Sequence, residues 1–211
     1  RLLPSGLLDG SFLEDLARYR YRGSSGKVNL ALDGLPEFTC LPGAGDHLRG
    51  AISFSPSIDY MEQAYDDAKS GRFSRRPYID MIIPTLVDPT MAPPGKHVIS
   101  CFVQYAPYKL APELGTWDDQ REAFGDAVVD RISEFAPGFK DSILFRNVQT
   151  PLDIERTTGL TEGNIFQGEL SLEQLFFNRP TPGYARFRTP LRDLWLCGSS
   201  THPGGGIMGA N

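Results

Sequence analysis

The sequence predicts an α+β protein in which helices cover a mixed β-sheet. Segments with strand-like and helix-like patterns alternate along the 211 residues, with no internal repeat and no low-complexity segment. Hydrophobic residues make up 40% of the chain and charged residues 22%, which is ordinary for a globular protein with one sizeable core. The 22 glycines and 17 prolines indicate many turns and short elements.

Five runs have the composition of strands. They are Lys27–Leu32, Ala51–Phe54, Tyr78–Ile83, Lys96–Tyr105 and Ile143–Val148. The third and fourth are dense in β-branched and aromatic residues and are bounded by proline. They are the most strand-like, and the turn-rich connection between them favours an antiparallel pair. Because these two runs are almost continuously apolar, we expect both faces of the sheet to be covered there.

Four segments have apolar residues at helical spacing. They are Ser11–Tyr21 with Ser11 as N-cap, a helix that begins at Pro56-Ser57 and stops at Gly71, a long helix that opens at Thr116 and ends at Pro137-Gly138, and Thr150–Thr157 with Pro151 at its first position. Asp118 and Asp119 fall in the first turn of the long helix, where the helix dipole favours acids. From Gly159 to Pro190 the sequence is loop-like and aromatic.

Charge and cysteine content exclude several classes of protein. A net charge of −5 argues against a nucleic-acid binder, and we interpret Arg72, Arg75 and Arg76 as a solvated helix end rather than a phosphate site. No apolar run approaches the ~20 residues of a membrane span. Three widely spaced cysteines fit a reducing compartment, with neither a disulfide framework nor a metal site.

The segment Leu194–Asn211 carries the most information about function. A short apolar strand is expected to lead through a turn of small residues into a triple glycine and the start of a helix. Glycines let a backbone approach a flat or anionic ligand, and a helix N-terminus offers unpaired N–H groups. We favour a ligand-contacting loop over a plain turn. Because the chain starts at Arg1 and stops at Asn211, we expect it to be a C-terminal piece of a larger protein.

This terminal segment resembles the C-terminal flavin-contacting signature of the phytoene desaturase-like FAD-dependent oxidoreductases, relatives of the amine oxidases. The signature is a strand, a glycine, small residues, and then Thr-His-Pro-Gly-x-Gly before a helix, here Thr201 to Gly206. Further stretches resemble one branch of this family, so that the likeness spans nearly the whole chain. They are Tyr21–Gly23, Lys27–Leu32, Phe38–Gly43, Ala64–Ala68, Ala92–His97, Gln104–Tyr108 and Gly163–Leu172.

The resemblance implies two parts of unequal size. Residues 1–190 correspond to a substrate-binding or cap domain, and residues 191–211 to a strand, loop and helix start of a Rossmann-like FAD-binding domain whose N-terminal half is absent. The residues that it implies for cofactor contact are Gly198, Ser199, Gly204, Gly205, Gly206, Ile207 and Met208. Many relatives place an acid where this chain has Ser199, so the resemblance does not supply a carboxylate contact to the ribose or ribityl chain.

The resemblance also implies that the segment from Gly163 to Phe177 passes near the flavin. Asn164, Phe166 and Gln167 are the candidates for lining a substrate cavity there, and an equally simple interpretation is a loop pinned by its aromatic residues. The catalytic residue is unknown from sequence, with Glu169 and His202 as candidates. We favour a structural role for His202, since a residue before Pro203 is held extended.

Two more polar residues fall in predicted strands. Asp80 interrupts an apolar run, and we expect it to lie on the wetter face by alternation rather than as a buried carboxylate. Lys27 begins a strand, where a solvent-facing edge lysine is the commoner case than a contact to an acidic substrate.

Two function classes follow. The first is a fragment of an FAD-dependent oxidoreductase, inactive alone, whose full-length form passes hydride between an apolar or conjugated substrate and flavin. The alternative is a non-catalytic binding or assembly domain with an aromatic partner surface. The partners expected for the oxidoreductase are an apolar small molecule and the missing FAD-binding half. We expect no metal and no nucleic acid, and homo-oligomerisation is left open. The expected compartment is the bacterial cytoplasm, or the mitochondrion in a eukaryote.

Overall fold

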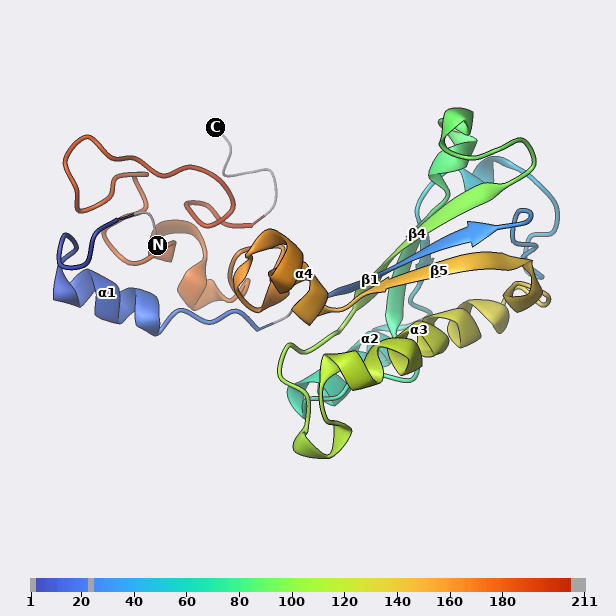
Figure 1. The fold of residues 1–211 in the computed structure, drawn as a ribbon, viewed down its shortest axis with the longest axis horizontal. Helices are drawn as coiled ribbons and strands as arrows, with labels where there is room; N and C mark the ends of the chain where they lie inside the picture. The colour runs from blue at the N-terminus through green and yellow to red at the C-terminus, as the bar shows by residue number, and fades with distance from the viewer. Residues whose placement is uncertain (1–2, 23–24, 206–211) are drawn as a thin grey trace.

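The computed structural model describes residues 3–22 and 25–205. These residues form two lobes, on the right and on the left of Figure 1. The larger lobe contains a β-sheet with two helices against one face, the smaller lobe contains the N-terminal helix and a long irregular segment, and a short helix lies between the two lobes. Within the described ranges, no helix has the length and apolar character needed to cross a membrane.

All five predicted strands are present, and they form one sheet of order β2-β3-β4-β1-β5. Their bounds are β1 Gly26–Leu32, β2 Ile52–Phe54, β3 Tyr78–Ile82, β4 His97–Gln104 and β5 Ile143–Gln149. Each lies within two residues of the range expected from composition. The predicted antiparallel pairing of β3 with β4 is confirmed, with Asp80 opposite Phe102.

The sheet is antiparallel throughout, so the prediction of a mixed sheet is wrong. Every hydrogen-bonded neighbour pair runs antiparallel. The chain does cross from β4 to β5 through a helix, which normally produces two parallel neighbours. Here β1 lies between β4 and β5 and pairs with both. Because β1 separates them, β4 and β5 run in the same direction without hydrogen bonding to each other.

All four predicted helices are present, but the first and the third end about four residues earlier than predicted. They are α1 Gly10–Ala17, α2 Ile58–Lys69, α3 Trp117–Ser133 and α4 Pro151–Thr158. The predicted cap of α1 is wrong: Asp9 is the N-cap and accepts a hydrogen bond from the backbone N–H of Ser11. Capping boxes hold the starts of α3 and α4, where Thr116 pairs with Asp119 and Thr150 with Asp153.

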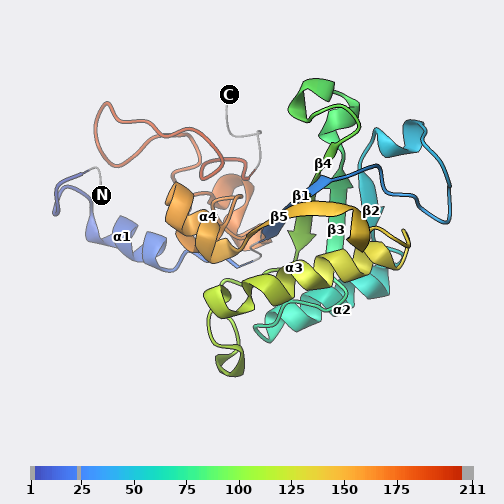
Figure 2. The ribbon, with the colours of Figure 1, turned by 45° about the vertical axis from the view of Figure 1, so that its right-hand side comes forward.

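Among the residues that the structure describes, helices cover one face of the sheet only, which corrects the expectation that both faces are covered. The α3 helix contributes Phe124, Val128 and Ile132 to the core, and α2 lies beside α3 on the same side (Figures 1 and 2). Alternate strand residues complete this core and are almost fully buried: Val28, Leu30, Leu32, Ile79, Met81, Ile99, Cys101 and Val103. On the opposite face, side chains of alternate residues are half-buried or exposed. This open face carries polar residues such as Asn29 and Ser100 together with apolar ones such as Phe102 and Phe145.

The smaller lobe joins residues that are far apart in sequence. Phe12 of α1 is buried against Tyr184, with ring centroids 4.7 Å apart. The backbone N–H of Arg20 donates to Oε1 of Gln174 at 2.8 Å, and the Gln174 amide returns a hydrogen bond to the Arg20 carbonyl. Residues 159–205 contain only short 3₁₀ turns and one isolated bridge. These side-chain contacts therefore hold the lobe in place of regular secondary structure.

The strand predicted at Leu194–Cys197 is absent, and only Trp195 forms an isolated bridge with Arg188. A strand needs a partner along its length. Leu194, Trp195 and Leu196 instead remain exposed. The Rossmann-like assignment of this segment is therefore not supported by its secondary structure and stays a prediction.

Candidate functional site

The buried side chain of Arg179 joins the two segments that the sequence singled out. Its relative exposure is 0%, and its Nε donates to the carbonyl oxygen of Ser199 at 2.9 Å. Its Nη2 donates to the carbonyl oxygen of Phe166 at 2.5 Å, and its Nη1 to that of Gln174 at 3.3 Å. One guanidinium therefore holds the loop at Ser199 against the segment from Gly163 to Phe177.

No carboxylate of the described chain pairs with this guanidinium. Its other contact is the Tyr19 ring, whose centroid lies 5.7 Å away. Burial lowers the pKa of Arg179 from its ordinary value, opposed by the nearby tyrosines. An arginine still remains charged at neutral pH. Residues 198–205, called the glycine loop below, thus pack against a buried positive charge. Composition gave no signal that Arg179 would be buried there.

The glycines of the loop differ in their surroundings. A Cβ on Gly204 would lie 2.6 Å from a methyl of Leu175, and a Cβ on Gly205 would lie 2.8 Å from the Cβ of Phe166. Gly205 is therefore required by packing within this chain, whereas Gly204 is favoured by its φ of +146°, since the Leu175 methyl could shift. Gly198 has a φ of +105°, and no atom lies within 4 Å of where its Cβ would be. It is needed for its backbone conformation, and its surroundings are open.

His202 lies in a pocket of about 480 Å³ between aromatic rings. Its ring stacks on Phe177, with centroids 5.3 Å apart, and meets the edge of Phe187 at 6.2 Å. Arg186 also lines the pocket. The Nδ1 atom of His202 is buried and has no hydrogen-bond partner among the described residues. The structural role that the sequence favours for His202 is supported by its packing between these rings, and not by a hydrogen bond of Nδ1 within the described chain.

The three cavity candidates have different roles in the structure. The Asn164 side chain is buried and donates to the carbonyl oxygens of Tyr21 and Arg22, at 2.8 and 3.3 Å. Its Oδ1 accepts from the backbone N–H of Phe166 at 2.8 Å. Phe166 is half-buried against Gly205, and Gln167 has a positive φ of 57°. Asn164 thus organises the turn that places Phe166 beside the glycine loop.

Glu169 faces two arginines. Its carboxylate lies 3.3 Å from Nε of Arg20 and 3.0 Å from Nη2 of Arg22, and the side chain is 17% exposed. Its backbone N–H also donates to the Arg20 carbonyl at 2.9 Å. These contacts tie the segment before β1 to the C-terminal lobe. The carboxylate is engaged in ion pairs, and the proposed catalytic role of Glu169 stays a prediction.

The remaining sequence candidates lie outside the described residues. They are Gly206, Ile207 and Met208, which the resemblance places at the helix start. The structure therefore bears on Gly198, Ser199, Gly204 and Gly205 only. No group of His, Cys, Asp or Glu in the described part of the chain has the arrangement of a metal site.

A second polar cluster lies on the open face of the sheet. Asp80 of β3 accepts a hydrogen bond from Ser53 of β2 and another from the Tyr78 hydroxyl, the latter at 2.5 Å. Burial and the neighbouring Asp80 carboxylate raise the pKa of Tyr78 above its ordinary value. The expectation that Asp80 lies on the wetter face is confirmed, and its partners explain how an apolar strand accommodates it.

Comparison with known proteins shows what this chain is similar to. No family model matches it. Pyridine nucleotide-disulfide oxidoreductase domain-containing protein 2 of Rattus norvegicus is 44% identical over 216 residues, which cover 99% of this chain. The chain is homologous to that protein. It spans only 37% of the relative's length.

More distant relatives match part of the chain. One of the subunits of limonene dehydrogenase from Castellaniella defragrans is 32% identical over 58% of this chain, which corresponds to 23% of the relative. Phytoene desaturase (lycopene-forming) of Pseudescherichia vulneris is 30% identical over 60% of this chain and 25% of the relative. The resemblance to phytoene desaturase-like proteins read from the sequence is thereby confirmed.

Proposed function

We propose that this chain is the substrate-facing part of an FAD-dependent oxidoreductase that acts on an apolar or conjugated molecule. The observation that carries the proposal is the identity of 44% along 99% of the chain to an oxidoreductase-domain protein. Two further relatives are named for the dehydrogenation of limonene and the desaturation of phytoene. Both of those compounds are apolar hydrocarbons, which suggests the class of substrate.

The smaller lobe has features that fit a flavin. The pocket at His202 falls within the usual size range of ligand pockets and has flat aromatic walls. Gly198 presents open backbone nearby in sequence, and Thr201 fixes its carbonyl through a hydrogen bond of 2.8 Å. The buried charge of Arg179 behind Ser199 would favour an anionic group beside the loop.

Each part of the chain would have a distinct task. When bound, FAD supplies the acceptor for hydride from a substrate carbon. Residues 191–211 would contact the flavin, with Gly198, Ser199, Gly204, Gly205, Gly206, Ile207 and Met208 as the contacting set, and residues 1–190 would form the cap over the substrate. Phe166 would help to exclude water, and His202 places at the pocket a buried ring nitrogen that has no hydrogen-bond partner among the described residues. We expect residues 1–211 alone to hold FAD weakly.

A binding or assembly role is the second candidate. Phe177 is 78% exposed, and Leu172, Phe176 and Trp195 are exposed in the same lobe. Apolar side chains of this kind on one lobe are typical of a covered surface. In the first candidate the remainder of a longer protein would cover them, and in the second a separate partner would.

The two candidates differ in a simple experiment. Full-length protein is purified, its flavin absorption is recorded, and it is mixed anaerobically with limonene or phytoene as candidate donors. Bound FAD that loses its visible absorption on mixing supports the oxidoreductase. A full-length protein that contains no FAD after reconstitution, yet assembles with a partner, would favour the second candidate.

A further inference from the structure

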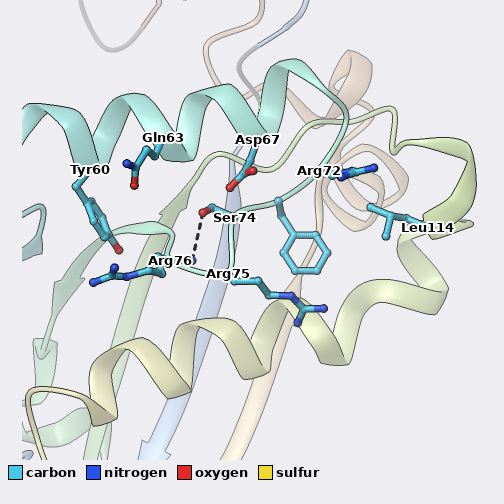
Figure 3. Close-up of a pocket in the computed structure, with 9 residues that line it drawn as sticks. Tyr60, Gln63, Asp67, Arg72, Ser74, Arg75, Arg76 and Leu114 are labelled. Carbon is cyan, nitrogen blue, oxygen red and sulfur yellow. Dashed lines mark hydrogen bonds between the residues drawn. The ribbon is translucent and has the colours of Figure 1, made fainter.

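A second pocket lies in the larger lobe, far in sequence from the glycine loop. It has a volume of about 350 Å³ and is bounded by α2 and by the segment that leads from α2 into β3. Figure 3 shows Tyr60, Gln63 and Asp67 projecting from one side of α2 toward this segment. The segment contributes Arg72, Phe73, Ser74, Arg75 and Arg76.

Two arginines at this pocket lack acidic partners. Arg72 forms an ion pair with Glu113, and Arg20, Arg146 and Arg156 likewise pair with carboxylates elsewhere in the chain. Arg75 and Arg76 have no carboxylate within 4 Å among the described residues, although the chain carries 26 acids and a net charge of −5. An uncompensated pair of neighbouring cations in an acidic protein indicates a ligand of opposite charge.

Aromatic rings hold these guanidinium groups in place. Arg75 lies over the ring of Phe73, 5.5 Å from its centroid, and Arg76 lies over the ring of Tyr60 at 5.6 Å. The Tyr60 ring is itself fixed, because its hydroxyl donates to the Pro77 carbonyl at 2.8 Å. A guanidinium that is stacked on a ring keeps its N–H edge free for an acceptor and loses less entropy on binding.

Ser74 adds a neutral donor between the two arginines. Its side chain is buried, and Oγ accepts a hydrogen bond from the backbone N–H of Arg76 at 3.2 Å. That contact uses a lone pair, so the hydroxyl hydrogen is free to donate to a ligand. The Asp67 carboxylate also lines the pocket and offsets one of the two unpaired charges. The balance at the pocket remains positive.

We propose that this pocket binds a phosphate monoester whose ester group is aromatic or otherwise apolar. Arg75, Arg76 and Ser74 would hold the phosphate oxygens, since forked guanidinium donors match phosphate geometry. Leu114 lines the same pocket and provides apolar surface for the ester group, while the Tyr60 and Phe73 rings hold the two guanidinium groups. The sequence alone favours a solvated helix end for these arginines, and the pocket with its stacked rings is what the structure adds. The site does not depend on the flavin.

Calorimetric titration of the full-length protein tests the proposal, with phenyl phosphate as the probe. Inorganic phosphate and phenol separate the contributions of the anion and of the ring. The test variant is R75Q/R76Q, with S74A as a milder second variant. The matched control is R18Q/R49Q, which removes two charges from exposed arginines elsewhere on the chain. Thermal denaturation of each variant establishes that it is folded.

We expect phenyl phosphate to bind more tightly than inorganic phosphate, and phenol not to bind. R75Q/R76Q should weaken binding at least about tenfold, because it removes both charge-assisted donors, while R18Q/R49Q leaves it unchanged. Should R75Q/R76Q fail to fold, weaker binding by S74A carries the same conclusion. Equal weakening in both arginine pairs would show general charge attraction and overturn the proposal. Binding to phosphatidylserine vesicles without binding of phenyl phosphate would also overturn it, in favour of a membrane surface.

Discussion

The Nε atom of Arg179 lies 2.9 Å from the carbonyl oxygen of Ser199, and this contact links the glycine loop to the rest of the smaller lobe. The same guanidinium reaches the Phe166 carbonyl. Since one buried side chain holds both segments, the position of the loop depends on a residue that has no part in the sequence signature. That dependence can be tested by mutation.

Replacing Arg179 with Met should destabilise the smaller lobe by about 3 kcal/mol, because three carbonyl oxygens, one buried and two partly buried, would lose their charged donor. Urea denaturation measures the change, and flavin content should fall in parallel. Arg192→Met is the matched control, since that side chain is 94% exposed. A fully stable Arg179→Met variant would show that the guanidinium is not what holds the loop.

Replacing Gly205 with Val should remove most of the bound flavin from the full-length protein. The new side chain would meet Phe166 and push the loop away, at a cost of about 2 kcal/mol. The larger lobe should remain folded, as measured by circular dichroism. Gly34→Val serves as the control, because a Cβ there meets no atom within 4 Å. Full flavin occupancy in Gly205→Val would argue that the loop does not approach the cofactor.

Sequence pattern located the strands and helices of the larger lobe. The strand within Lys96–Tyr105 and the helix after Thr116 carry local signals, namely β-branched composition and a capping box, which act within a few residues. Pattern failed where pairing decides the structure. The apolar run of β4 gave no sign that one face would be open, and the insertion of β1 between β4 and β5 leaves no local trace.

The candidate site was predictable only in part. The glycines could be identified from the sequence. The residues that they contact, Leu175 and Phe166, lie about 30 and 40 positions earlier in the chain and could not. The role of Arg179 could not be predicted, because nothing in the sequence distinguishes a buried arginine in a polar and aromatic stretch from an exposed one. Asp80 was interpreted correctly, since alternation along a strand is a local property.

Replacing Glu169 with Gln should lower stability by about 1 kcal/mol, because the partly buried carboxylate pairs with Arg20 and Arg22. Flavin content should stay normal. Glu173→Gln removes a more exposed partner of Arg20 and should have no measurable effect on stability. A loss of turnover in Glu169→Gln at unchanged stability would instead indicate a direct role of this carboxylate in the reaction.

Alkaline pH should destabilise the larger lobe, because the Cys101 thiol is buried there. Burial raises the pKa of this thiol to about 12, so above pH 9 the unfolded chain loses the proton that the folded chain retains. Between pH 7 and about pH 10.5 this difference should cost about 2 kcal/mol of stability. Urea denaturation of wild type and Cys101→Ala at both pH values isolates the contribution. Equal pH dependence in the two proteins would mean that the thiol ionises normally in the fold.

The central claim, that this chain faces substrate in an FAD-dependent oxidoreductase, is tested most directly by anaerobic absorption spectroscopy of the purified full-length protein. We expect a bound flavin whose visible band bleaches when an apolar donor such as phytoene or limonene is added, and recovers with an electron acceptor. A full-length protein that takes up no FAD on reconstitution would contradict the claim.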